Sequence, residues 1–204
     1  MKVRWAFPLV ALIILLAGCQ TTSIRSAWFD TDFAGPPLRR IVVVGSIDTL
    51  ADGRVFEDLF AEKLRAAGVD GIAGHTVVPD AARTSEAQFV SAVVGSGAQG
   101  LLLVRLLGVE TRTQVTTTMV PGGMGWWGPG TWSSHPTAVR VPVQQVSRYD
   151  LATAEAKLYD VQTKQLIWAA TTSTFNPRSV ARETPGFADV VIGQLSSRGI
   201  IAGR

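Results

Sequence analysis

A glycine-rich segment gives the clearest match to a known chemical motif in this sequence. Gly95, Gly97 and Gly100 have the spacing G-x-G-x-x-G, which in dinucleotide-binding proteins lets the backbone approach a pyrophosphate. That chemistry requires the glycines to follow a strand and to open a helix, because the pyrophosphate sits at the helix N-terminus. Here the apolar pattern predicts the reverse order, a helix that ends at Gly95 and a strand that follows Gly100. We therefore interpret the segment as a helix end and a turn, and we expect no cofactor there.

Few other side chains have the types and spacing that acid–base or nucleophilic catalysis needs. The two histidines, His75 and His135, are far apart and lack the H-E-x-x-H spacing of a metal-binding helix. The acids Glu57, Asp58 and Glu62 are interpreted as the solvated face of a helix. The sequence contains no G-x-S-x-G segment, no Walker lysine and no cysteine nucleophile. We therefore expect no catalytic residues, no metal site and no enzymatic activity.

The segment 121–132 combines large apolar residues with glycine and proline. It reads PGGMGWWGPGTW, and its large side chains are those of Met124, Trp126, Trp127 and Trp132. Glycine and proline at this density disfavour helix and strand, so these side chains either pack on their own domain or face a partner. Tryptophan is enriched at binding hot spots and at membrane interfaces. These four residues are the candidate contact with a partner or a membrane, and packing on the domain is the alternative.

The elements that would position these segments alternate between strand and helix in the first half of the chain. A β-branched run over 41–44 predicts a strand buried on both faces. Apolar residues at helical spacing predict a helix over 54–67. A strand is expected over 75–78, a second helix from Ser85 and a further strand over 101–106.

The second half of the chain predicts strands and one closing helix. Strands are expected over 111–120, 139–146, 151–161 and 165–175, followed by an amphipathic helix over 187–198. The whole pattern predicts one α/β (α+β) domain in which helices pack on a mixed sheet of about six strands. The expected order of elements is β-α-β-α-β-β-β-β-β-α.

The charge of the chain argues against a nucleic-acid partner. The formal charge is +3, and Lys2 and Arg4 contribute two of these charges, so that 3 − 2 = +1 remains for the rest. The other cations are mostly scattered arginines and form no basic stripe of the kind that follows a phosphate backbone.

The first 18 residues have the pattern of an export signal. Lys2 and Arg4 precede an apolar run over 5–17, which is shorter than the ~20 residues that a transmembrane helix needs. The run ends in Leu-Ala-Gly-Cys, which resembles the lipobox of bacterial lipoproteins. The resemblance implies cleavage between Gly18 and Cys19 and a covalent lipid on Cys19 as the only attached group. A plain membrane anchor or an ordinary secretory signal are the alternatives.

The residue after the cysteine bears on the expected location. In lipoproteins of this kind an aspartate there favours retention at the inner membrane, and this chain has Gln20. The resemblance thus implies an outer-membrane protein that faces the periplasm. Residues 1–18 would be the signal peptide, 19–27 a lipidated tether and 28–204 the periplasmic domain. Because Cys19 is the only cysteine, the lipidated chain would have no free thiol.

Four short hydrophobic motifs extend the resemblance along the chain. Together with the lipobox they resemble a group of Gram-negative (proteobacterial) outer-membrane lipoproteins with a periplasmic α/β domain of unassigned function. The order of elements is also similar to the small domain of outer-membrane activators of peptidoglycan synthases and of the curli secretion lipoprotein. The motifs are Trp28-Phe29-Asp30, Val55-Phe56-Glu57, Leu158-Tyr159-Asp160 and Leu166-Ile167-Trp168.

The resemblance implies an outer-membrane-anchored, non-enzymatic interaction or accessory module of the cell envelope. Its partners would be the membrane, through the lipid, and an envelope protein, without a small-molecule cofactor. A regulator of a peptidoglycan synthase or of a secretion complex is an alternative, and a periplasmic hydrolase is a further one.

Overall fold

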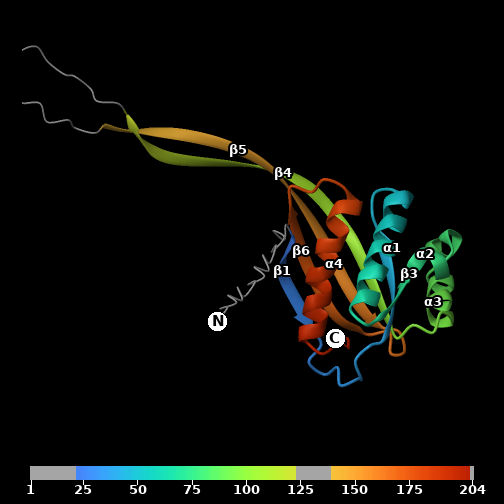
Figure 1. The fold of residues 1–204 in the computed structure, drawn as a ribbon. Coiled ribbons are helices and arrows are strands. Elements are labelled where there is room, and N and C mark those ends of the chain that lie inside the picture. The colour runs from blue at the N-terminus through green and yellow to red at the C-terminus, as the bar shows by residue number, and fades with distance from the viewer. Residues whose placement is uncertain (1–21, 123–138, 203–204) are drawn as a thin grey trace, which may run out of the picture.

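Six strands form one mixed sheet in the computed structural model, which describes residues 22–122 and 139–202. The order across the sheet is β1-β6-β5-β4-β2-β3, and β2 pairs in parallel with both β3 and β4, whereas the other pairs are antiparallel. The predicted single mixed sheet with packed helices is confirmed (Figure 1). The strands are β1 (Thr22–Phe29), β2 (Arg40–Ser46), β3 (Asp70–Ala73), β4 (Gly100–Gly122), β5 (Val139–Asp160) and β6 (Leu166–Phe175).

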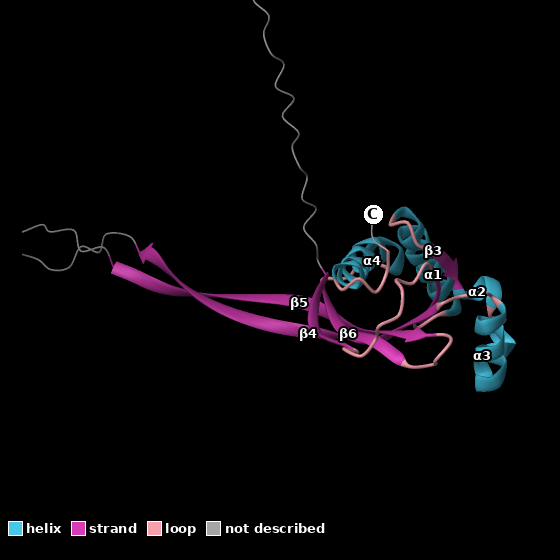
Figure 2. Cartoon of the chain, turned by 90° about the horizontal axis from the view of Figure 1, so that it is seen from below, coloured by secondary structure: helices cyan, strands magenta, loops and turns pink. Residues whose placement is uncertain are grey.

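Helices cover both faces of the sheet where it is widest (Figure 2). On one face, α1 (Leu50–Ala66) and α4 (Val180–Ser197) pack side by side over the main core, which includes Phe60, Trp168 and Leu195. The other face of β2 is covered by α2 (Gly74–Val77), a 3-10 turn (Asp80–Thr84) and α3 (Glu86–Gly95). The run over 41–44 is buried on both faces as predicted, because its side chains alternate between these two cores.

The sheet begins earlier in the chain than the sequence indicated. Residues 22–27, which we expected to belong to a tether, form most of β1, and this strand pairs with β6 from Thr22↔Thr174 to Phe29↔Trp168. Thr22 is buried, and its hydroxyl lies 2.8 Å from the hydroxyl of Thr174. Five of the eight residues of β1 are exposed, because it is an edge strand, so it lacks the apolar pattern of a buried strand.

The expected strand over 75–78 is wrong. The chain forms β3 just before it, over Asp70–Ala73, and residues 74–77 form the short helix α2. Short apolar runs do not distinguish strand from helix by periodicity, and here a tertiary contact decides. The backbone N–H of His75 donates to the Glu57 carboxylate at 2.6 Å and is therefore not available to a sheet ladder.

Two pairs of expected strands are each one long strand. The segments 101–106 and 111–120 both belong to β4, and 139–146 and 151–161 both belong to β5. A bulge at Leu107 interrupts the β4–β5 ladder, since Leu106 faces Ala154 while Gly108 faces Thr153. Gly108 has a φ of 157°, which a glycine adopts without a steric penalty.

Candidate functional site

Beyond the bulge, β4 and β5 continue as a two-stranded ribbon that leaves the rest of the domain (Figure 1, Figure 2). The last residue of β6, Phe175, pairs with Leu151, so no described strand flanks the ribbon past that point. We call residues 111–122 and 139–150 the β4–β5 arm. Its twelve residues in each strand correspond to a length of about 40 Å.

The register of the β4–β5 arm distributes its apolar side chains over two faces. On the face that continues the side of the sheet covered by α1 and α4, Val115 pairs with Val146, and Met119 pairs with Pro142. The side chains of Val115, Val146 and Met119 are 57%, 60% and 59% exposed, respectively. The opposite face carries three further exposed valines, namely Val120, Val141 and Val143. The arm therefore has apolar side chains on both faces that remain between about a third and two thirds exposed.

The charged residues of the β4–β5 arm are mostly arginines. Within the described arm residues, the charges are Arg112, Arg140, Arg148 and Asp150, so that 3 − 1 = +2 results. The acid lies at the base, where Asp150 accepts a hydrogen bond from the Thr111 hydroxyl at 2.7 Å. Past this first pair the described arm is cationic and otherwise uncharged.

The residues that the sequence singled out as contacts adjoin this arm in the chain. Segment 121–132 begins with the last two residues of β4, but Met124, Trp126, Trp127 and Trp132 lie outside the described residues, as do Gly18 and Cys19. Their proposed contact role therefore stays a prediction. The projection of the arm was not predicted, although the Thr-rich composition of 111–120 lacks a single apolar face and is a signal of exposure.

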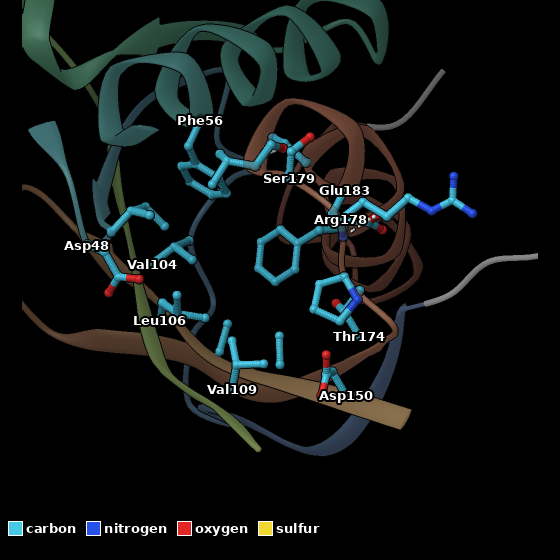
Figure 3. Close-up of a pocket in the computed structure, with 17 residues that line it drawn as sticks. Asp48, Phe56, Val104, Leu106, Val109, Asp150, Thr174, Arg178, Ser179 and Glu183 are labelled. Carbon is cyan, nitrogen blue, oxygen red and sulfur yellow. Dashed lines mark hydrogen bonds between the residues drawn. The ribbon is translucent and has the colours of Figure 1, made fainter. Parts of the chain in front are cut away.

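A cavity of about 340 Å³ lies at the base of the arm, between α1, α4 and the sheet (Figure 3). Its floor is formed by Val104, Leu106 and Val109, and Phe56 stands on the α1 side. Its lining also includes charged groups, Asp48, Asp150, Glu183 and Arg178. Thr174, which pairs with the first residue of β1, belongs to the lining as well, so the N-terminal end of the described chain enters the domain beside this cavity.

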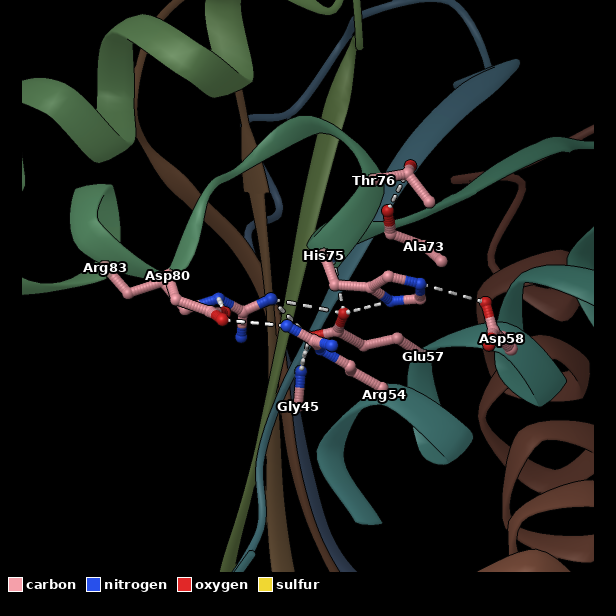
Figure 4. Close-up of polar contacts among 9 residues, drawn as sticks. All are labelled: Gly45, Arg54, Glu57, Asp58, Ala73, His75, Thr76, Asp80 and Arg83. Carbon is pink, nitrogen blue, oxygen red and sulfur yellow. Dashed lines mark hydrogen bonds and ion pairs between the residues drawn. The ribbon is translucent and has the colours of Figure 1, made fainter. Parts of the chain in front are cut away.

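The second polar feature is centred on Glu57 of α1, which is 0% exposed (Figure 4). One carboxylate oxygen accepts from the N–H of Gly45 at 3.0 Å, and the other accepts from the N–H of His75 at 2.6 Å. Arg83 donates to both oxygens at 3.0 and 3.2 Å, and Nδ1 of His75 lies 3.1 Å away. The predicted solvated face is therefore wrong for Glu57, whereas Glu62 is exposed.

The geometry around Glu57 is that of a structural clamp. Its carboxylate links α1 to the end of β2 through Gly45, to α2 through His75 and to the 3-10 turn through Arg83. A Cβ at Gly45 would lie 2.7 Å from the Phe56 ring, and one at Gly74 would lie 2.7 Å from the Val43 carbonyl oxygen. Both oxygens of Glu57 are engaged by donors, so the carboxylate holds these elements together instead of presenting a free base.

The crevice at the carboxyl end of β2 has the topology at which open α/β sheets bind ligands, because α1 and α3 leave on opposite faces of the sheet. Arg54 and Arg83 line it. Each is already paired with an acid, Arg54 with Asp80 at 2.8 Å and Arg83 with Glu57. Thr49 caps α1 by accepting from the N–H of Asp52 at 3.1 Å. The cations and the helix start of this crevice are thus used within the fold.

The glycine-rich segment has the order that the sequence predicted. α3 ends at Gly95 and β4 begins at Gly100, with Gly97 at a φ of 70° in the turn between them. His75 lies in α2, and His135 lies outside the described residues. Among residues 22–122 and 139–202, three or more His, Cys, Asp or Glu side chains nowhere come together as metal ligands. Within the same residues, every helix is too short or too polar to cross a membrane.

Comparison with known proteins gives a likeness in fold only. Neither a family model nor a curated protein matches the sequence. Among solved structures, the chain is similar to PelC from Paraburkholderia phytofirmans, described as a dodecamer, in two crystal forms. The L103M variant has a TM-score of 0.46, and the other form has 0.45. Both are 14% identical, with 88% of this chain and 99% of PelC covered.

A second similar structure is the lipoprotein GNA1162 from Neisseria meningitidis. Its TM-score is 0.41 at 12% identity, with 78% of this chain and 98% of that chain covered.

Proposed function

We propose that this chain is a lipid-anchored accessory protein of the Gram-negative envelope that acts by binding, and that the β4–β5 arm is its contact element. The observation that carries the proposal is an arm of about 40 Å with both faces and both strand edges uncovered by the described domain. A two-stranded hairpin is marginally stable by itself in water, so an arm of this kind gains stability from whatever it contacts.

The exposed side chains of the arm support a binding role. Val115, Met119 and Val146 form an apolar group on one face, and such groups on a protein surface mark interaction sites when they are contiguous. The open backbone edges offer N–H and C=O groups to a further strand. The Trp-rich segment 121–132 continues from the end of the arm and is proposed to extend the same contact surface.

The anchoring part of the proposal concerns Cys19 and the outer membrane. The lipobox-like sequence before Cys19 supports lipidation, and Gln20 supports placement at the outer membrane, facing the periplasm. The proposal includes no catalytic role, which is supported by the use of Glu57, His75 and Arg83 as a clamp. The domain would then hold the arm in place near the membrane.

Photo-crosslinking in intact cells tests the binding role. The full-length protein carries a photoreactive residue at Met119, with Glu62 on α1 as an exposed control position. We expect a discrete adduct from position 119 that is absent from position 62. The same result at both positions, with the protein present at the membrane, would contradict a contact role for the arm.

Mass spectrometry of the membrane-extracted protein tests the anchor. We expect the chain to begin at Cys19 and to carry acyl groups there, and a Cys19→Ser variant to lack them. An unmodified Cys19 in the mature protein would contradict the proposed lipid anchor.

A further inference from the structure

We infer that the β4–β5 arm lies along the same lipid surface that holds the anchor, with its face of Val115, Met119 and Val146 against the phospholipid. This inference rests on the proposed lipidation of Cys19. It names the partner of the arm as a lipid surface, and it follows from where the chain enters the sheet.

The entry point of the chain is the base of the arm. β1 runs antiparallel to β6, so its first residue, Thr22, pairs with Thr174 at the end of β6. The next residue of β6, Phe175, pairs with Leu151, and the arm begins one residue further along β5, at Asp150. The buried hydrogen bond between the hydroxyls of Thr22 and Thr174 holds the chain there. The N-terminal end of the described chain and the arm thus share one end of the sheet.

The distance from the lipid to this entry point is short. Two residues separate Cys19 from Thr22, so the two are three residue steps apart, and three steps of extended chain span at most about 11 Å. A lipid on Cys19 therefore keeps the base of the arm within about 11 Å of the membrane surface. A tether that ran to residue 27 would have allowed a much larger separation, but β1 removes that freedom.

This distance limits the direction in which the arm can point. The helix-covered body and the arm extend to opposite sides of the base (Figure 1, Figure 2). If the arm pointed away from the membrane, the body would have to fit between its base and the lipid. The ten residues of β6 alone measure about 34 Å, roughly three times the reach of the tether. Two orientations of the arm remain, one along the membrane surface and one pointing into the membrane.

The open edges of the arm decide between these two directions. In the hydrocarbon core, every unpaired backbone N–H and C=O costs several kcal/mol, and the outer edges of a lone hairpin carry a full row of them. At the interface, headgroups and water satisfy these groups while apolar side chains on one face still reach the acyl region. A surface orientation is therefore favoured over insertion.

The side chains fit an anionic phospholipid surface. The face with Val115, Met119 and Val146 also carries Arg140, opposite Pro121, and Arg148, opposite Thr113. Arginine can keep its guanidinium at the headgroups while its methylenes lie on apolar neighbours, and cations near anionic lipid are attracted to it. The opposite face carries one arginine, Arg112, which is paired with Glu110 at 3.2 Å. We therefore assign the first face to the lipid.

A fluorescent probe on the arm tests this contact. When Cys19 carries lipid, an introduced cysteine is the only thiol of the mature chain, so Met119→Cys and Glu62→Cys can each be labelled specifically in the full-length lipidated protein. The labelled proteins are placed in vesicles of phosphatidylethanolamine and phosphatidylglycerol with nitroxide-bearing lipids. We expect a blue shift and nitroxide quenching at position 119, less of both at Val143→Cys on the opposite face, and neither at position 62.

The outcomes separate this inference from the proposed function. If the protein floats with the vesicles but position 119 behaves like position 62, the anchor stands and the membrane contact is wrong. Equal quenching at 119 and 143 would overturn the assignment of the face. A protein that does not float with vesicles would overturn the anchor, and this inference with it. A photo-adduct from Met119 to a protein and not to lipid would replace the lipid surface by a protein partner.

A second variant tests whether the quenching comes from the apolar face of the arm and not from binding of the probe itself to lipid. Val115→Thr with Val146→Thr keeps β-branched residues in the arm but removes the apolar pair, so the ribbon is retained. We expect this double change to abolish the quenching of a probe at position 119. The control is Leu50→Gln, which removes an exposed apolar side chain from α1 and should leave the quenching unchanged. Undiminished quenching in the double variant would contradict contact through this face.

Discussion

Replacing Glu57 by glutamine tests whether this buried carboxylate holds the helices to the sheet. The change keeps the shape of the side chain but gives it one oxygen where there were two. If the amide oxygen takes the place of the oxygen that accepts from Gly45, the amide NH₂ group faces the N–H of His75, which is also a donor. The N–H of His75 then loses its acceptor, whereas Arg83 keeps its 3.0 Å bond to the remaining oxygen and loses the 3.2 Å bond and the carboxylate charge.

The size of the effect follows from the burial of these donors. A buried donor without a partner costs about 1–3 kcal/mol. The Arg83 side chain is 22% exposed, lies 3.8 Å from Asp80 and keeps one oxygen as acceptor, so the N–H of His75 accounts for most of the effect. We expect Glu57→Gln to lower the free energy of unfolding by about 2 kcal/mol, a large share of the roughly 5–15 kcal/mol of an ordinary domain.

Urea unfolding of a non-lipidated Cys19→Ser chain measures this difference, with the slope of the transition as a check that the native state stays compact. The matched control is Glu62→Gln, on the same helix but exposed, for which we expect a change within about 0.5 kcal/mol. In a double-mutant cycle, Glu57→Gln and Arg83→Met should be strongly non-additive. A loss for Glu57→Gln that equals the loss for Glu62→Gln would refute the clamp.

Four further changes test other parts of the structure. Deleting residues 113–148 and joining Arg112 to Tyr149, which pair in register, by an Asn-Gly turn should change the free energy of unfolding by less than about 1 kcal/mol. The reason is that the side chains of residues 113–120 and 140–148 are exposed, and a larger loss in urea would show that the arm supports the core. Gly71→Ala should lower the melting temperature, since its Cβ would lie 2.5 Å from the Ala61 carbonyl oxygen, whereas Gly193→Ala in α4, with open space around it, should raise it. Thr49→Ala removes the cap of α1 and should cost about 1 kcal/mol in the same unfolding assay, and no loss would mean that the cap bond is replaced by water.

The long or strongly patterned elements could be predicted from the sequence. The run over 41–44 predicts a buried strand, because four apolar β-branched residues in a row are typical of a strand that has a core on each face. The turn between Gly95 and Gly100 was predictable from the order of helix and strand around it. Residues 75–78 were not, because the hydrogen bond from the N–H of His75 to Glu57 depends on a residue 18 positions away.

The features that matter for the site were harder to predict. Glu57 lies three residues before Phe60 and seven before Leu64, so its helical position did place it on the buried stripe, but its acidic type suggested solvent. The strands of the arm could be predicted as strands. Their projection could not, because it depends on where β6 stops pairing, at Phe175 opposite Leu151. The short tether likewise became visible only once β1 was seen to pair with β6.

Hydrogen exchange tests the claim that the β4–β5 arm is the contact element of an anchored protein. The amide exchange rates of the full-length lipidated protein in isolated envelope membranes are compared with those of the Cys19→Ser chain in buffer. Because a lone two-stranded hairpin is marginally stable, its amides should exchange quickly in buffer and slowly at the membrane. We expect slower exchange over residues 111–122 and 139–150 at the membrane, with the exchange rates of α1 and α3 unchanged. Equally fast exchange of the arm in both samples, from protein shown to be lipidated, would contradict it.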